Sequence, residues 1–314
     1  MSQPHLLVVV HTEEEFDWNA PFSRTATATS HIPSLVRGQQ LFDAHGIRPV
    51  YAIDWPVVTD PQAVETLRSF VDRGAVIGTH LHPWVSPPFE EAVGRATSYP
   101  GNLPAALERA KIATLTHRIA TAFDMRPRIY LAGRYGFGPN TAATLEALGY
   151  EVDLSLAPPF DFRADGGPDY RHTDLRPVRV GGIWCVPHTG AFIGPFGAWP
   201  LALAAWSAAG PLGRAWRSVV GRQGLLQRVR LSPEGFEIAD LRRLTLALID
   251  RGIRLFVFSF HSPSLAPGFT PYVRDEDGLR RLFSTIDEYL HWFRLDLAGL
   301  WTEPDRLRET LIKL

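Results

Sequence analysis

Titratable side chains are concentrated where one apolar segment of the chain ends. Residues 9–18 read VVHTEEEFDW, so a run typical of a buried strand is followed at once by His11, Glu13, Glu14, Glu15 and Asp17. One acid at such a position is commonly a solvated loop residue, but four acids and a histidine are more than a strand end needs. The stretch therefore indicates a site where these groups bind a partner.

A pair of imidazoles follows a different apolar segment. His80 and His82 are two residues apart, so in an extended backbone both side chains point the same way and can bind one ion. Two histidines and one carboxylate leave an open position for water on zinc or a related ion. We expect Glu13 to be that carboxylate, because alternation puts it on the same side as His11, whereas Glu14 should face away as a solvated or capping residue. A hydrogen-bonded pair of loop histidines is the alternative.

The elements that must position these residues alternate between strands and helices. Seven short apolar runs are typical of a parallel sheet that is buried on both faces: 6–10, 50–53, 76–79, 129–132, 151–154, 183–186 and 255–260. Helices are expected between most of them, including one that starts at Asp60-Pro61 and one that starts at Ser232-Pro233-Glu234. Such units give an open doubly wound sheet or a closed barrel. No repeat or linker divides residues 1–314, which predicts a single domain.

Polar residues follow every one of these predicted strands. In a parallel barrel the carboxyl ends of all strands share one rim, where such enzymes build their sites. The residues at or after the seven strand ends are, in chain order, His11 with Glu13, Asp54, His80 with His82, Arg134 with Tyr135, Asp153, His188 and His261. We therefore expect acids, histidines and an arginine from distant parts of the sequence to converge.

Composition excludes several classes of function. The chain has 314 residues, of which 45% are hydrophobic and 21% charged, which is enough apolar material for one large domain. The formal net charge of −1 gives no broad basic field, so nucleic acid is not an expected partner. Cys185 is the single cysteine, which rules out an intramolecular disulfide and favours a reducing, cytoplasmic setting.

One segment is unusually apolar. No Lys, Arg, Asp or Glu occurs from Cys185 to Gly213, but Pro200 and the Gly210-Pro211 pair interrupt the run, so it falls short of the roughly 20 residues that a membrane span needs. We interpret residues near 190–227 as an apolar insertion. It could pack on the barrel wall, cover the site, or make peripheral contact with a membrane.

Five motifs spread along the chain resemble those of the polysaccharide deacetylase superfamily, also called the NodB homology family, and within it the WalW-like branch. They are HTEEEFDW (11–18), GTHLHPWVSPPF (78–89), GRYGFGPNT (133–141), EVDLSLAPPFDF (151–162) and FVFSFHSPSL (256–265). The resemblance implies an α/β fold, a distorted (β/α)7 TIM-like barrel. It also implies a divalent metal held by an acid and two histidines, and hydrolysis of N-acetyl groups from amino sugars.

The resemblance assigns metal ligands by position. Glu13 and His80 resemble two of the family's ligands. The family's second histidine usually lies four residues after the first, where this chain has Trp84, so His82 is the available substitute.

The resemblance also assigns catalytic residues. Arg134 resembles the arginine that orients the base, and Asp153 matches an acid with a structural or charge-tuning role that Arg134 could hold. His261 resembles the general acid. The family's base is normally an aspartate where this chain has His11, so either this histidine is the base or the chain is a relative that has lost its base.

The resulting hypothesis is a metal-dependent hydrolase, with zinc the expected ion, that removes N-acetyl or similar acyl groups from an amino sugar or polysaccharide intermediate. The alternatives are an inactive carbohydrate-binding relative and an amide hydrolase with a non-sugar substrate. Aromatic residues near strand ends are expected to contact the sugar: Trp18, Trp55, Trp84 and Tyr135. If the apolar segment touches lipid, the substrate is expected to be a lipid-linked sugar.

Overall fold

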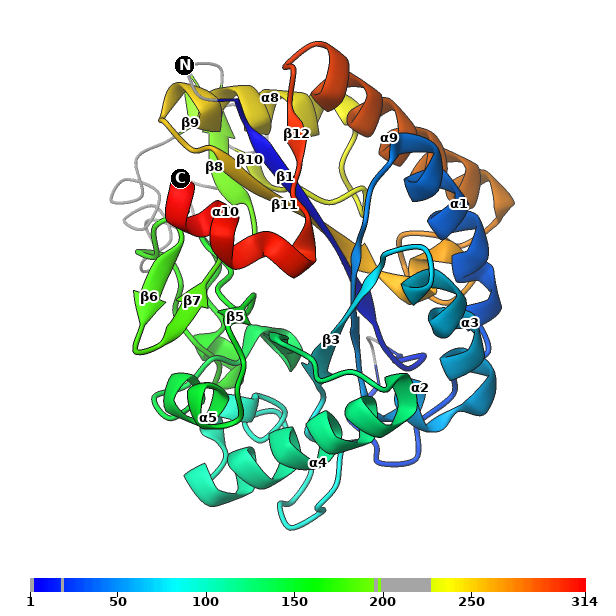
Figure 1. The fold of residues 1–314 in the computed structure, drawn as a ribbon, viewed down its shortest axis with the longest axis vertical. Coiled ribbons are helices and arrows are strands. Elements are labelled where there is room, and N and C mark those ends of the chain that lie inside the picture. Colours follow the sequence, from blue (N-terminus) through cyan, green and yellow to red (C-terminus); the bar gives the residue numbers. More distant parts are fainter. Residues whose placement is uncertain (1–2, 18–19, 195–196, 199–226) are drawn as a thin grey trace.

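The computed structural model describes residues 3–17, 20–194, 197–198 and 227–314 as one mixed α/β domain built on a curved sheet (Figure 1). All seven predicted strands are present and run parallel to one another: β1 (His5–Thr12), β2 (Val50–Ile53), β3 (Val76–Leu81), β4 (Ile129–Ala132), β5 (Val152–Asp153), β7 (Ile183–Cys185) and β11 (Leu255–His261). The distorted α/β barrel expected from the sequence is confirmed.

The sheet is curved but is not closed by strand pairing. Its order is β11-β1-β2-β3-β4-β5-β7-β6, where β6 (Val178–Val180) is antiparallel to β7, and β12 (Leu300–Trp301) pairs with the start of β1. A second, antiparallel sheet of β10 (Gln227–Arg230), β8 (Gly190–Gly194) and β9 (Gly197–Ala198) fills the opening beside β11. The backbone of Leu231, just after β10, bonds to both sides of this opening, since its N–H donates to Thr189 and its carbonyl accepts from Ser259.

Helices cover the outer face of the sheet (Figure 1). They are α1 (Leu35–His45), α2 (Trp55–Thr59), α3 (Pro61–Val71), α4 (Ala105–Phe123), α5 (Thr141–Ala147), α8 (Ile238–Asp250) and α9 (Glu276–Leu295). The predicted start of α3 is confirmed, because the Asp60 side chain accepts a hydrogen bond from the Gln62 N–H. The predicted start of α8 is wrong: the helix begins at Ile238 with a capping box formed by Glu237 and Asp240, which leaves Ser232–Glu234 free for another role.

Alternation along the strands sorts their side chains into two layers. Leu7 and Val9 face the inside of the curved sheet, where they pack with Leu131 and Val257, and α10 (Leu307–Lys313) closes one end of this inner cluster. The intervening residues of β1 face the helices. His11 has the same parity as Leu7 and Val9, so the strand aims this imidazole inward at its carboxyl end.

The apolar insertion lies largely outside the described residues, which include only β8, β9 and β10 of the 190–227 range. The expectations that it covers the site, packs on the wall or touches lipid therefore stay predictions. Within the described part of the chain, every helix is too short or too polar to cross a bilayer.

A buried cation, Lys111 on α4, holds the loop that follows β3. Its ammonium donates to the carbonyl oxygens of Pro83, Ser86 and Pro88 at 3.0, 2.6 and 2.7 Å, and it lies 3.1 Å from Glu91 Oε1. Because this loop begins directly after His82, Lys111 fixes the backbone from which that imidazole projects.

Replacing Lys111 with methionine is expected to lower the free energy of unfolding by about 3 kcal/mol, because three carbonyls and a carboxylate lose their cation. Urea unfolding followed by circular dichroism measures the change. The matched control is Lys313→Met at the chain's only other lysine, which is exposed and should change stability by less than about 0.5 kcal/mol. Equal unfolding midpoints for the two variants would refute this role of Lys111.

Candidate metal and acid–base centre

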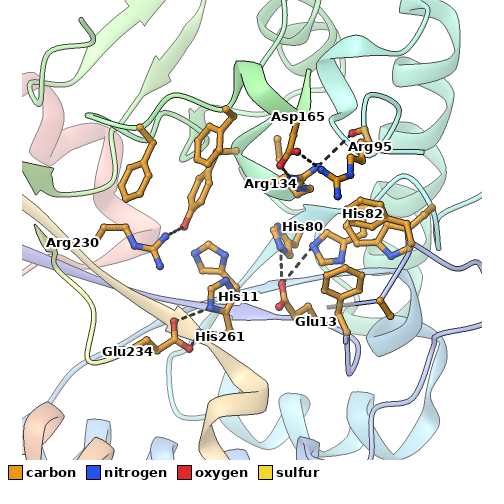
Figure 2. Close-up of a pocket in the computed structure, with 18 of the residues that line it drawn as sticks. His11, Glu13, His80, His82, Arg95, Arg134, Asp165, Arg230, Glu234 and His261 are labelled. Carbon is orange, nitrogen blue, oxygen red and sulfur yellow. Dashed lines mark hydrogen bonds and ion pairs between the residues drawn. The ribbon is translucent and has the colours of Figure 1, made fainter. Parts of the chain in front are cut away.

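A pocket of about 820 Å³ lies at the carboxyl ends of the parallel strands (Figure 2). Residues from β1, β3, β11 and the loops after β4 and β10 line it, as the convergence of strand ends predicts. The polar residues among them include His11, Glu13, His80, His82, Arg134, Tyr135, Arg230, Glu234 and His261.

Glu13, His80 and His82 converge on one point of the pocket wall (Figure 2). Glu13 Oε2 lies 3.2 Å from His80 Nε2 and 3.5 Å from His82 Nε2. The opposite nitrogens are also engaged, since His80 Nδ1 lies 3.0 Å from the Leu131 carbonyl and His82 Nδ1 lies 2.7 Å from Glu14 Oε2. If each Nδ1 carries the proton, both Nε2 lone pairs point towards Glu13.

This donor set fits a divalent metal ion. Burial lowers the pKa of His80 and of His82, so both imidazoles are neutral, the form that binds metal. Burial also raises the pKa of Glu13, but His261, His80 and His82 outweigh it and bring that pKa to about 2, so the carboxylate stays charged. A carbonyl or carboxylate behind each ligating imidazole is the usual outer support of a metal site.

Glu14 does not face solvent as alternation predicts; it is fully buried beside Asp54. Its two oxygens accept hydrogen bonds from His82 Nδ1 at 2.7 Å and Trp84 Nε1 at 2.8 Å, and its backbone N–H donates to Asp54 at 2.8 Å. The alternation fails because β1 ends at Thr12, so the backbone at Glu14 is no longer a strand.

Glu14, Asp54 and His82 form a second group that could hold a metal ion, but it is less suited to one. Burial raises the pKa of Glu14 to about 7 and raises that of Asp54 well above its ordinary value, so the two carboxyl groups share a proton. Neither acid lines the pocket. We therefore interpret this pair as the outer support of His82.

Glu15 has a separate role from the two preceding acids. Its carboxylate accepts hydrogen bonds from the Ser30 hydroxyl at 2.6 Å and the His31 backbone N–H at 2.9 Å. His31 Nε2 is in turn 2.8 Å from the Ser262 hydroxyl, which accepts from the Glu13 N–H at 3.3 Å. Of the three glutamates after β1, Glu13 thus provides the inward carboxylate, Glu14 supports His82, and Glu15 supports the backbone of Glu13 through His31 and Ser262.

His11 is a buried imidazole at the centre of a cluster of rings. Its ring centroid lies 4.8 Å from that of His261 and 5.3 Å from those of His80 and His188. Burial holds the pKa of His11 well below its ordinary value, and nearby basic groups, of which His261 acts most strongly, lower it further. The Nε2 of His11 has no hydrogen-bond partner among the described residues. A neutral ring with an unused lone pair can accept a proton or add a ligand to the set that contains Glu13 and His80.

His261 forms a pair with Glu234 (Figure 2). Its Nδ1 lies 2.8 Å from Glu234 Oε2, and its backbone N–H donates to the same carboxylate at 3.1 Å. Burial lowers the pKa of His261, but the charges of Glu234 and Glu13 outweigh burial and raise it above its ordinary value. His261 can therefore hold a proton at neutral pH and deliver it into the pocket, as a general acid must.

The loop after β4 brings two strained residues into the pocket. Arg134 and Tyr135 have φ values of 52° and 59°, a left-handed conformation that is costly for side chains of this size. The preceding Gly133 allows close approach to β3, because a Cβ there would lie 2.5 Å from the Leu81 carbonyl and 2.6 Å from His82 Cδ2.

Arg134 does not contact Asp153, contrary to the sequence expectation. It pairs with Asp165 at 2.9 Å, donates to the Ser98 hydroxyl at 2.7 Å and stacks on Tyr99. Asp153 lies behind the pocket wall, where it accepts from the Ser155 hydroxyl, and burial raises its pKa to about 7. The register of β5 aims Asp153 away from the pocket.

The four predicted sugar-binding aromatics do not lie together. Trp84 and Tyr135 line the pocket, and Trp84 stacks on His82 with centroids 4.3 Å apart. Trp55 instead begins α2 and lines a separate surface groove. Trp18 lies outside the described residues. Other aromatic residues that sequence reasoning did not select line the pocket: Phe16, Phe22, Phe160, Phe162, Phe236 and Tyr272.

Sequence reasoning also missed Glu14, Asp165, Arg230 and Glu234 as residues of this centre. For Glu234 the sequence did contain a signal, because a glycine, Gly235, follows it directly and disfavours a helix start at this point. In the structure Gly235 has a φ of 78°, which is incompatible with the helix expected there. The other three carry no local signal, because their partners are distant in sequence.

The sequence places His188 at the rim formed by the strand ends but gives it no role. It is buried, and its Nδ1 is hydrogen-bonded to the Ser259 hydroxyl at 2.9 Å.

Comparison with solved structures finds matches over nearly the whole chain. One is a candidate polysaccharide deacetylase from Mycobacterium smegmatis, with a TM-score of 0.51 and 14% identity over 99% of this chain and 91% of that one. A probable polysaccharide deacetylase from Pseudomonas aeruginosa PAO1 has a TM-score of 0.55 and 13% identity over 98% and 89%. PuuE allantoinase has a TM-score of 0.56 and 13% identity over 97% and 89%.

No family model and no curated protein matches the chain. At these identities the structural matches establish the fold, and the assignment to the WalW-like branch stays an interpretation. The curved sheet with its seven predicted parallel strands and the structural matches over nearly the whole chain agree, so this chain has the fold of the polysaccharide deacetylase, or NodB homology, superfamily.

Proposed function

We propose that this chain is a divalent-metal-dependent hydrolase that removes an N-acetyl or related acyl group from an amino sugar or polysaccharide intermediate. The observation that carries the proposal is the convergence of Glu13 Oε2 with His80 Nε2 and His82 Nε2, at 3.2 and 3.5 Å, in a pocket that also contains the His261–Glu234 pair. The assignment of two structural neighbours as polysaccharide deacetylases supports the substrate class.

Glu13, His80 and His82 would hold the ion, and zinc suits a set of two imidazoles and one carboxylate. When bound there, it would act as a Lewis acid towards an amide carbonyl. Glu14 would keep the His82 ring oriented through the hydrogen bond to Nδ1, and the Leu131 carbonyl would do the same for His80.

The remaining residues supply proton transfer. His11 accepts a proton from the attacking water, because its ring is neutral and its Nε2 is unpartnered among the described residues. Protonated His261 donates to the departing amine, and Glu234 stabilises the proton on it beforehand. The two rings lie next to each other, with centroids 4.8 Å apart, which supports action of both on the same small acyl group.

A specific observation favours a second candidate, hydrolysis of a non-sugar amide. PuuE allantoinase is as similar in fold as the deacetylases are, with a TM-score of 0.56. The inactive-relative alternative differs from both, because it requires a pocket that binds sugar without turning it over.

Metal analysis and acetate release from N-acetylated chitooligosaccharides test the proposal together. We expect about one zinc ion per chain, and acetate release that stops on chelation and returns when zinc is added back. Metal-free protein that binds the oligosaccharides without releasing acetate under any metal condition would support the inactive relative. Release of ammonia from ureide or cyclic amide substrates, with no acetate from sugars, would support the second candidate.

A further inference from the structure

Arg230 is the last residue of β10, and its side chain lines the side of the pocket opposite His82 (Figure 2). Its Nη1 donates to the Tyr135 hydroxyl at 3.0 Å, and its guanidinium carbon lies 5.5 Å from the centroid of the Phe160 ring. The ion pairs among the described residues include none to Arg230. The acid whose charge acts on it, Glu234, is bound to His261 at 2.8 Å instead.

Two of the other three arginines of the pocket differ from Arg230 because each has an acid partner. Arg95 and Arg134 both pair with Asp165 at 2.9 Å, and Arg228 lies over the Phe160 ring at 4.2 Å. Taken together, four arginines and three acids line the pocket in the described part of the chain, which leaves a positive balance before any histidine proton or metal ion is counted.

A guanidinium inside a protein pocket is costly unless an anion pairs with it. Among the described residues, the Arg230 guanidinium donates one hydrogen bond, to the neutral phenol of Tyr135. Its planar group matches a carboxylate or phosphate with two parallel hydrogen bonds. Tyr135 holds it from a backbone position with φ of 59°, and such strained positions cluster at binding sites. Arg230 is also close enough to the reaction centre for its charge to act on both His11 and His188.

We propose that the substrate of this pocket carries an anionic group, a carboxylate or a phosphate ester, and that Arg230 binds it beside Tyr135 while the acyl group faces Glu13, His80 and His82. The proposal rests on the proposed function only for the placement of the acyl group. The preference for an anion follows from Arg230 and the pocket charge.

Calorimetric binding of three probes tests this without relying on turnover: N-acetylglucosamine, N-acetylglucosamine 1-phosphate and N-acetylmuramic acid, which are respectively neutral, phosphate-bearing and carboxylate-bearing. The wild-type protein is expected to bind at least one anionic probe about 30-fold more tightly than the neutral one. Arg230→Gln should remove that difference and leave the neutral sugar unchanged. The better anionic probe identifies the phosphate or the carboxylate as the group recognised.

Two further variants separate a binding role from a structural one. Arg280→Gln removes an exposed arginine on α9 outside the pocket and should leave the anion preference intact. Arg230→Lys keeps the charge and should retain part of the preference, which also guards against misfolding of the glutamine variant.

Equal affinities of the wild-type protein for all three probes, binding of neither anionic probe at millimolar concentration, or an equal loss for all probes in Arg230→Gln would overturn the inference. Acetate release without an anion preference would refute this inference alone. An Arg230-dependent preference without acetate release would refute the proposed function alone.

Discussion

Replacing Glu13 with glutamine is expected to abolish tight divalent-metal binding and to lower metal-dependent turnover by about 10³-fold or more. The amide keeps the shape of the side chain but removes the carboxylate charge that faces both His80 and His82, at 3.2 and 3.5 Å. Loss of a ligand should exceed the 10–100-fold effect typical of outer-support residues. Titration of metal-free protein with zinc, monitored by competition with a chromophoric chelator, measures the affinity.

Glu14→Gln, the same substitution at the adjacent residue, is the comparison variant for this zinc titration. We expect it to weaken zinc binding by only about 10–100-fold, because Glu14 acts through the hydrogen bond to His82 Nδ1. Glu151→Gln, in a surface pair with Arg128, should change nothing. If Glu14→Gln abolishes binding while Glu13→Gln binds zinc as the wild type does, the ion belongs to the group of Glu14, Asp54 and His82, and our assignment is wrong.

Replacing His261 with asparagine should lower turnover by about 10²–10⁴-fold while zinc affinity stays within a few-fold of the wild type. The side chain lies outside the proposed ligand set but holds the proton that the leaving amine needs. Steady-state rates together with the same zinc titration separate the two effects. A joint loss of zinc binding and turnover would show that His261 is a ligand or a structural residue and not the general acid.

Glu234→Gln tests the assignment of His261 as the general acid through the pH dependence of turnover. Glu234 raises the pKa of His261, so the protonated imidazole is present below that pKa and turnover falls as pH rises through it. Removing the carboxylate's charge lowers the pKa of His261, so the falling limb of the pH–rate profile should move to lower pH. Ser264→Ala removes one hydrogen bond from Glu234 but leaves its charge, and should move the limb less. An unshifted limb in Glu234→Gln would exclude His261 as the titrating acid.

The local sequence determined the strands and the residues at their ends. Runs of apolar residues predicted all seven parallel strands, and alternation correctly placed Glu13 on the same side as His11, since both side chains line the pocket. Asp60 and Pro61 likewise predicted the start of α3. These features depend on backbone geometry over a few residues, so a single sequence contains enough information to predict them.

The tertiary structure alone decided the partners of the loop residues. Glu14 binds His82, 68 positions away, and Glu234 binds His261, 27 positions away, although local rules predicted a solvated acid and a helix start. Arg134 likewise pairs with Asp165 and not with Asp153. The loop after β5 brings Asp165 to the pocket, whereas Asp153, on β5 itself, points behind the pocket wall and binds Ser155. Such pairs form only when separate loops pack against each other, and neither strand alternation nor helix periodicity extends across that distance.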